Sequence, residues 1–169
     1  MQVFGPVLHE VASPESLNTS VKDFYFSIVK HSKTPEQLAA FQGSWVDVRD
    51  LADAHVKAIE VPNAGGQRFI ISSGNFIWQD WCTCILALYF SSKFLKHRFF
   101  PFVAVDAVNE LAIPGITAPT GTPGAGKVLQ HKQIYNTTKS RTVLGVQYKD
   151  KPSTAKDSLA NFKERGWAA

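Results

Sequence analysis

The sequence predicts a single domain of the α/β class. Short apolar segments of β type alternate with segments of helical periodicity, and the 169 residues match the length of one ordinary domain. Hydrophobic residues make up 44% of the chain and charged residues 19%, so a buried core is expected and wholesale disorder is excluded. The expected strands are too few for an independent doubly wound sheet, which indicates part of a larger fold.

The first third of the chain predicts a helix, a strand and a second helix. Apolar residues recur at near-helical spacing between Pro14 and His31, and Pro14 suits a first turn. Trp45–Val48 predicts a short strand, and Asp50 is expected to cap the helix that follows. That helix has a mainly apolar stripe, which consists of Leu51, Ala54, Val56, Ala58 and Ile59.

The later segments continue this alternation. Gln67–Ser72 contains three consecutive apolar residues, which predicts a strand covered on both faces. A helix is expected to begin near Asn75, and another to cover about Thr137 to Leu144. A last helix is expected from Ser153 or Thr154, as N-cap, to Arg165, with Gly166 ending it.

Composition argues against several classes of protein. Two cysteines cannot form a disulfide scaffold, so a reducing cytoplasm is the expected location, and residues 1–10 show no signal-peptide pattern. The net charge of +4 is concentrated in residues 127–169, which contain nine Lys/Arg and three Asp/Glu. These basic residues are scattered singly, without an aromatic ladder, so a solvated surface is favoured over nucleic-acid binding.

No metal site is expected either. The spacing places Asp47 on a strand and both Asp50 and Asp53 at a helix start, where capping and the helix dipole explain the carboxylates. The five histidines show no ligand spacing, and Cys82 and Cys84 form one isolated pair.

Several segments carry a family resemblance through their order and spacing. They are Val3–Pro6, Leu17–Ser20, Trp45–His55, Gly66–Ser72, Thr122–Gly126 and Lys139–Gly145. Together they closely resemble the carboxy-terminal half of extended short-chain dehydrogenase/reductases, in particular the dihydroflavonol-reductase-like branch with its fungal NADPH-dependent aldehyde and ketone reductases. The resemblance covers nearly all of residues 1–169 except about 82–104.

The resemblance implies a partial fold. It assigns the chain the last strands and the substrate-binding subdomain of a Rossmann-type NAD(P)-binding fold, with the amino-terminal Rossmann core missing. The family's glycine-rich turn and its catalytic Tyr-x-x-x-Lys pair have no counterpart here. Tyr89–Lys93 and Tyr135–Lys139 have the bare spacing, but both follow Val3–Pro6, whereas the family pair precedes that segment. We therefore expect an amino-terminal truncation that does not catalyse alone, and surface helix pairs at these two positions.

The resemblance also assigns cofactor contacts. Val3 and Ser20 match positions that touch NADP in family members, and an apolar side chain beside the nicotinamide and a hydroxyl at a polar edge suit that role. Phe4 is expected either to line the substrate pocket or to be a core aromatic residue. No residue of this chain is assigned a catalytic role.

The implied parent activity is NADPH-dependent reduction of a small aldehyde or ketone. One alternative is a non-enzymatic remnant, which would self-associate through apolar surface left uncovered by the missing half. The other is a different member of the superfamily: an epimerase, a dehydratase or a hydroxysteroid-type dehydrogenase.

Residues 82–104 are expected to be an insertion foreign to the family. Joining Trp81 to Val105 restores an amphipathic helix that has Trp78 and Trp81 on its apolar side and Gln79 on its polar side. Lys93, Lys96, His97 and Arg98 argue against a membrane span. A translated, unspliced intron is the preferred interpretation, and it predicts poor packing of the segment. A buried or misplaced helix and a membrane-surface helix are the alternatives.

Overall fold

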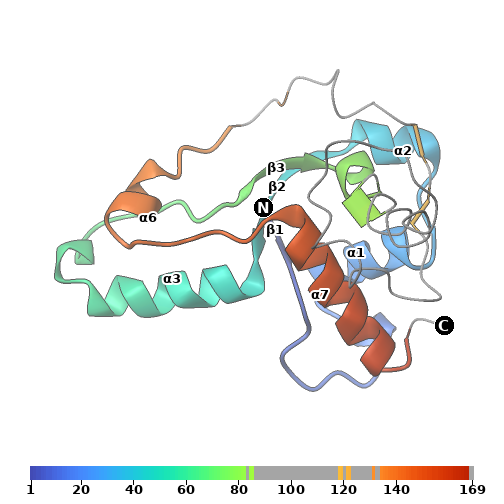
Figure 1. The fold of residues 1–169 in the computed structure, drawn as a ribbon, viewed down its shortest axis with the longest axis horizontal. Coiled ribbons are helices and arrows are strands. Elements are labelled where there is room, and N and C mark those ends of the chain that lie inside the picture. Colours follow the sequence, from blue (N-terminus) through green and yellow to red (C-terminus); the bar gives the residue numbers. More distant parts are fainter. Residues whose placement is uncertain (83, 86–117, 120, 123–130, 132–133, 168–169) are drawn as a thin grey trace, which may run out of the picture.

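The fold centres on a small mixed sheet with helices around it, which confirms the α/β class (Figure 1). The computed structural model describes residues 1–82, 84–85, 118–119, 121–122, 131 and 134–167. In the described part of the chain the sheet has the order β1-β2-β3, and the strands are β1 (Gln2–Phe4), β2 (Gln42–Asp47) and β3 (Gly74–Ile77). β1 runs parallel to β2 with Val3 opposite Val46, and β3 runs antiparallel to β2.

The helical segments lie between and after these strands. Their bounds are η1 (Pro14–Ser16), α1 (Thr19–Ile28), α2 (Pro35–Ala40), α3 (Val48–Glu60), η2 (Pro62–Ala64), α6 (Thr138–Thr142) and α7 (Lys151–Glu164). The predictions of a helix before residue 31, a strand at Trp45 and two late helices are confirmed. The first predicted helix is divided, because a short 3-10 turn precedes α1.

The predicted caps of α3 and α7 are wrong for the same physical reason. In both cases an aspartate that lies earlier in the chain accepts from a free backbone N–H of the first turn. Asp47 accepts from the Arg49 N–H at 2.9 Å and begins α3, so Asp50 lies inside the first turn. Asp150 accepts from the Ser153 N–H at 2.9 Å and begins α7. Gly166, at φ +72°, follows the end of α7 as predicted.

Residues 67–72 are extended, but they do not form the predicted strand. Phe69 and Ile71 pack against a small core cluster, whereas the side chain of Ile70 is 40% exposed. The segment is therefore covered on one face only, and the strand follows it as β3. The helix expected near Asn75 begins at residue 78, after this strand.

The main core is an aromatic cluster around Phe4. Its ring centroid lies 5.2 Å from Phe24, 5.5 Å from Phe76, 5.8 Å from Trp78 and 5.2 Å from Trp81. These rings come from β1, α1, β3 and the helical residues after β3. Contacts among aromatic rings therefore join the sheet to the elements that cover it.

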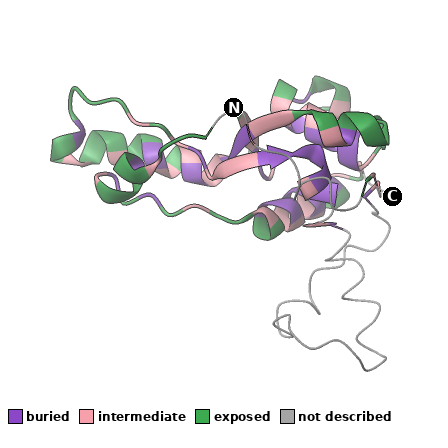
Figure 2. Ribbon diagram, turned by 90° about the horizontal axis from the view of Figure 1, so that it is seen from above, coloured by how far each residue is buried: buried purple, intermediate pink, exposed green. Residues whose placement is uncertain are grey.

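The second cluster is smaller and lies in an arm formed by α3, residues 67–72 and α6 (Figures 1 and 2). Its buried members are Ala54, Ala64, Leu144 and Val146. The apolar stripe predicted for α3 is only partly used here, because Val56 and Ile59 are 52% and 86% exposed. Much of α3 faces solvent (Figure 2).

The start of the proposed insertion is packed in the main core. Cys82 and Ile85 are buried there beside Trp78 and Trp81. Gln79, expected on the polar side, is also buried, and its Oε1 accepts from the Thr122 N–H at 2.7 Å. Residues 86–104 lie outside the described residues, so the poor packing expected of the whole segment stays a prediction.

Gly5 allows β1 to turn sharply at its carboxyl end. Its φ is +128°, and a Cβ atom there would lie 2.9 Å from Cγ1 of Val48 and 3.3 Å from Oδ1 of Asp47. We expect Gly5→Ala to lower the free energy of unfolding by about 1–3 kcal/mol, because backbone strain and a steric clash add together. Gly66→Ala is the matched control, since φ is +69° but no atom lies within 4 Å. Urea unfolding measures both effects. If the two substitutions lower the free energy of unfolding equally, a steric clash at Gly5 does not explain its loss.

Candidate functional site

The carboxyl ends of β1 and β2 meet at one edge of the sheet because the two strands are parallel. Asp47, at the end of β2, has a fully buried side chain. Its Oδ1 accepts from the N–H and Nε of Arg49, both at 2.9 Å, and its Oδ2 accepts from Nη2 of Arg49 at 2.8 Å and from Oγ1 of Thr154 at 2.7 Å. This carboxylate therefore joins β2, α3 and α7.

Arg49 extends this network to a second point on α7. Its Nη1 donates to Oδ2 of Asp157 at 2.6 Å, so one guanidinium bridges two carboxylates. Burial alone would raise the pKa of Asp47, but the hydrogen bonds from Arg49 and Thr154 outweigh it and hold the pKa below its usual value. Asp47 is therefore ionised and fully paired at neutral pH.

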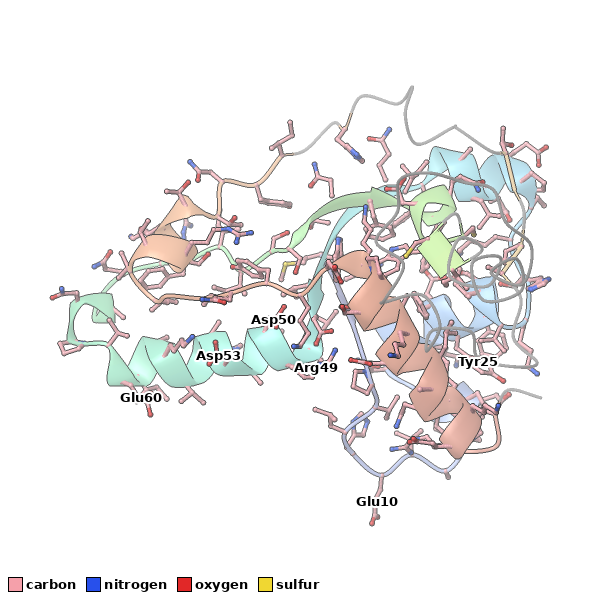
Figure 3. All side chains as sticks on the ribbon, in the orientation of Figure 1. Glu10, Tyr25, Arg49, Asp50, Asp53 and Glu60 are labelled. Carbon is pink, nitrogen blue, oxygen red and sulfur yellow. The ribbon has the colours of Figure 1, made fainter. Side chains whose placement is uncertain are left out.

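Asp50 follows Arg49 in α3 (Figure 3), and its pKa is shifted in the opposite direction from that of Asp47. Its Oδ2 accepts from the Lys149 N–H at 2.7 Å, which holds the segment before α7 against α3. Burial raises the pKa of Asp50, and the nearby charge of Asp47 raises it further. Asp53 forms an ion pair with Lys57 on α3 at 2.7 Å. In the described residues no three potential ligand side chains gather into a metal site.

The residues expected to contact the cofactor lie on adjoining elements. Val3 is half-buried in β1, and Ser20 is half-buried in the first turn of α1, which packs against β1. Phe24 follows Ser20 by one helical turn and packs on Phe4, so Ser20 lies on the side of α1 that faces β1. Phe4 is 1% exposed and lies among aromatic rings. Of the two roles that the sequence allowed, lining the substrate pocket or belonging to the core, this burial agrees with the second.

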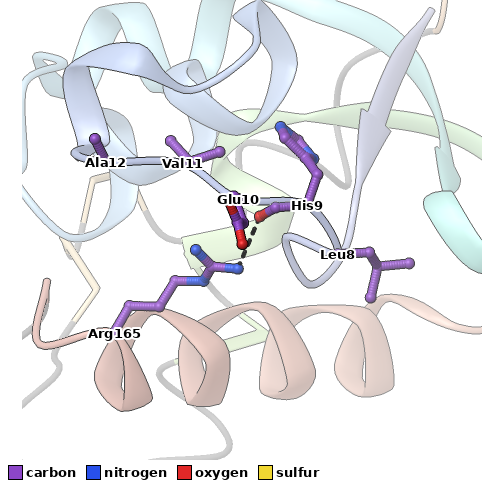
Figure 4. Close-up of a pocket in the computed structure, with 6 residues that line it drawn as sticks. All are labelled: Leu8, His9, Glu10, Val11, Ala12 and Arg165. Carbon is purple, nitrogen blue, oxygen red and sulfur yellow. Dashed lines mark hydrogen bonds between the residues drawn. The ribbon is translucent and has the colours of Figure 1, made fainter.

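An open cavity of about 590 Å³ lies along the loop that joins β1 to α1 (Figure 4). Nη2 of Arg165, after α7, donates to the carbonyl oxygen atoms of Val7 at 2.8 Å and His9 at 3.1 Å. The Val7 N–H donates to Oδ1 of Asn161 at 3.0 Å. The lining residues are Leu8, His9, Glu10, Val11, Ala12 and Arg165.

Sequence reasoning missed the roles of Asn161 and Arg165. Each side chain binds a backbone group about 155 residues away along the chain, and no local spacing indicates such a contact. Together they hold the loop between the two expected cofactor elements.

The hydroxyl groups of Tyr25 and Tyr148 form hydrogen bonds to other described residues. The Tyr25 hydroxyl donates to the carbonyl oxygen of Trp167 at 2.6 Å. Tyr135 precedes α6, so Tyr135–Lys139 is not the expected helix pair, and Nζ of Lys139 lies 5.1 Å from the ring centroid of Phe69. Tyr89–Lys93 lies outside the described residues. Among the helices that the structure describes, none is long and apolar enough to cross a membrane.

A parallel β1–β2 pair, a loop over its carboxyl edge and surrounding helices are typical of a piece of a Rossmann-type α/β protein. Comparison with known proteins makes this specific. Gre2 from Candida albicans matches with a TM-score of 0.70 and 28% identity, covering 98% of this chain and 43% of that one. Its complex with NADPH matches with a TM-score of 0.68 and 29% identity, covering 96% of this chain and 41% of that one.

Curated relatives agree with these structures. Ketoreductase azaE of Aspergillus niger is 30% identical over 96% of this chain and 41% of its own length. The NADPH-dependent methylglyoxal reductase GRE2 of Saccharomyces cerevisiae is 26% identical over 95% of this chain and 40% of its own length. No family profile matches the chain. The relatives confirm the resemblance to fungal reductases of the extended short-chain dehydrogenase/reductase family, and the chain spans about two fifths of their length.

The two aspartates at the start of α3 give a matched test of this network. Asp47→Asn breaks a buried ion pair, so we expect the free energy of unfolding to fall by about 3–5 kcal/mol at pH 7. Asp50→Asn keeps an acceptor for the Lys149 N–H and removes a charge that burial disfavours. We therefore expect its stability to equal or exceed that of the unchanged protein.

Urea unfolding across pH checks the sign of both effects. The folded pKa of Asp47 is lowered, so its contribution is present above the unfolded pKa and is lost as pH falls through the folded value. The folded pKa of Asp50 is raised, so its charge is destabilising at pH 7, and any gain in Asp50→Asn disappears below the unfolded pKa. A large loss in Asp50→Asn at pH 7 would contradict this assignment.

Proposed function

We propose that this chain is the carboxy-terminal part of an NADPH-dependent reductase that converts a small aldehyde or ketone to an alcohol. It would supply one side of the cofactor site and much of the substrate pocket. The observation that carries the proposal is the match to a Gre2–NADPH complex over 96% of this chain at 29% identity. The hydride would come from the nicotinamide, and the proton from a tyrosine in the part of the parent enzyme that this chain does not match.

Val3 and Ser20 are the proposed cofactor contacts. Val3 lies in β1, which is parallel to β2, and the carboxyl edge of such strands is the usual ligand side of the sheet. Its apolar side chain suits the nicotinamide face. Ser20 offers a hydroxyl in the first turn of α1, where the N-cap Asn18 makes no side-chain hydrogen bond to the helix. A polar group of the cofactor would therefore meet donors at this helix end.

The names of the relatives favour a reductase over an epimerase, a dehydratase or a hydroxysteroid-type dehydrogenase. We propose a cytoplasmic setting, with which the two free cysteines agree. Residues 82–104 remain proposed as a translated intron within this part of the reductase.

The test uses a fusion protein in which this chain replaces the part of Candida albicans Gre2 that it matches. The rest of Gre2 is kept. We expect this fusion to bind NADPH, seen as energy transfer from tryptophan to the nicotinamide. The 169-residue chain alone should not oxidise NADPH with methylglyoxal, because the proposed proton donor is not part of it. Ser20→Ala in the fusion should weaken NADPH binding about threefold to tenfold, the cost of one hydrogen bond.

Ser16→Ala is the matched control, because Ser16 is an exposed hydroxyl four residues before Ser20. It should leave the dissociation constant for NADPH unchanged. A folded fusion that binds no NADPH, while intact Gre2 binds it under the same conditions, would reject the proposal. Equal effects of the two substitutions would reject the role of Ser20.

A further inference from the structure

The end of α7 holds the loop that follows β1. Both backbone groups of Val7 bind side chains of this end: the N–H donates to Oδ1 of Asn161 at 3.0 Å, and the carbonyl oxygen accepts from Nη2 of Arg165 at 2.8 Å. The same nitrogen of Arg165 donates to the carbonyl oxygen of His9 at 3.1 Å (Figure 4). One guanidinium therefore fixes two peptide groups of the loop between β1 and α1.

The same end of α7 also holds α1. Gly166, at φ +72°, turns the chain after the helix, and the Trp167 N–H donates back to the carbonyl oxygen of Phe162 at 2.9 Å. The carbonyl oxygen of Trp167 accepts from the Tyr25 hydroxyl of α1 at 2.6 Å. Tyr25 is 2% exposed, and its ring centroid lies 5.3 Å from that of Phe162, so α1 and the end of α7 are packed together as well as hydrogen-bonded.

Arg165 joins these two sets of contacts. Its guanidinium carbon lies 5.1 Å from the ring centroid of Trp167, while its Nη2 binds the loop. Asn161, Arg165 and Trp167, which we call the α7 clamp, therefore fix the loop after β1 on one side and α1 on the other.

The α7 clamp has a consequence for ligand binding. A protein that holds its contact residues in place before a ligand arrives loses less conformational freedom when the ligand binds. Val3 lies in β1, directly before the held loop, and Ser20 lies on α1, which follows it. Both of the proposed cofactor contacts therefore adjoin segments that the α7 clamp orders.

We propose that the α7 clamp positions the loop after β1 and α1, so that Val3 and Ser20 are already arranged for NADPH in the free protein. Arg165 is then a positioning residue, which acts on the cofactor through the loop and does not touch it. This inference rests on the proposed function, because it concerns the same cofactor site.

Hydrogen exchange of the 169-residue chain tests the α7 clamp without NADPH. The Val7 N–H is bonded to Asn161 and not to Arg165, so its exchange reports whether Arg165 orders the loop as a whole. We expect Arg165→Met to speed exchange of this amide by about tenfold or more, because two hydrogen bonds from a charged donor are lost. Lys163→Met removes an exposed charge from the same helix and should leave the rate unchanged.

NADPH binding to the fusion with Gre2 tests the effect on the cofactor. Arg165→Met and Tyr25→Phe should each raise the dissociation constant about threefold to tenfold. Arg165→Lys should recover part of the loss, because an ammonium group can still donate to a loop carbonyl. Lys163→Met is again the control and should bind NADPH as the unchanged fusion does.

A double-mutant cycle distinguishes positioning from a general loss of stability. If the α7 clamp holds Ser20 in place, Ser20→Ala should weaken NADPH binding less in the Arg165→Met fusion than in the unchanged fusion. Tyr25→Phe removes a single hydroxyl group, so it provides the same comparison if Arg165→Met does not fold.

The outcomes separate this inference from the proposed function. An unchanged fusion that folds and binds no NADPH rejects both. If the unchanged fusion binds NADPH and the folded Arg165→Met and Tyr25→Phe fusions bind it equally well, only the role of the α7 clamp is rejected. That role is also overturned if Ser20→Ala has the same effect in both backgrounds, or if Arg165→Met leaves the exchange of the Val7 amide unchanged.

Discussion

The carboxylate of Asp47 is the interaction on which the described structure depends most. It ends β2, begins α3 and accepts a hydrogen bond from Thr154 on α7, while Arg49 carries the connection on to Asp157. An ionised group with no access to water is stable only when its partners are complete, so these elements must assemble together. Because Gly5 has no side chain, β1 can turn close to this carboxylate, and the turn sets the start of the loop that leads to α1.

This arrangement explains how the proposed cofactor residues are positioned. Val3 is held by its parallel pairing with β2, and Ser20 by the packing of α1 on β1 through Phe24 and Phe4. The loop between them is held by Asn161 and Arg165 at the other end of α7. α7 therefore supports both sides of the proposed site, although none of its residues is proposed to contact the cofactor.

The sequence predicted the elements that depend on local periodicity or turn chemistry. The helices before residue 31 and after Asp150, the strand at Trp45 and the helix end at Gly166 belong to this group. It did not predict which aspartate caps α3, because Asp47 and Asp50 are equally good caps and burial of the strand end decides between them. The segment Gln67–Ser72 has the composition of a strand, but a strand also needs a hydrogen-bonded neighbour, and composition alone does not show whether the fold provides one.

The candidate site divides in the same way. Val3, Ser20 and Phe4 were proposed from the order of short family segments, a signal that survives at about 30% identity. The contacts of Arg165, Asn161 and Thr154 were not found, because they join residues more than 100 positions apart. The sequence also did not predict that an apolar face of α3 is exposed. A helical wheel shows which residues share a face, but it does not show whether another element covers that face.

A double-mutant cycle between Asp47→Asn and Thr154→Val tests the role of this carboxylate most directly. Thr154→Val removes the hydroxyl that donates to Asp47 and keeps the shape of the buried side chain. If Asp47 joins α7 to the sheet, the losses in the free energy of unfolding will be non-additive, with a coupling of about 1–2 kcal/mol. Losses that add to within about 0.5 kcal/mol would contradict the account, because the two groups would then be stabilising the fold independently.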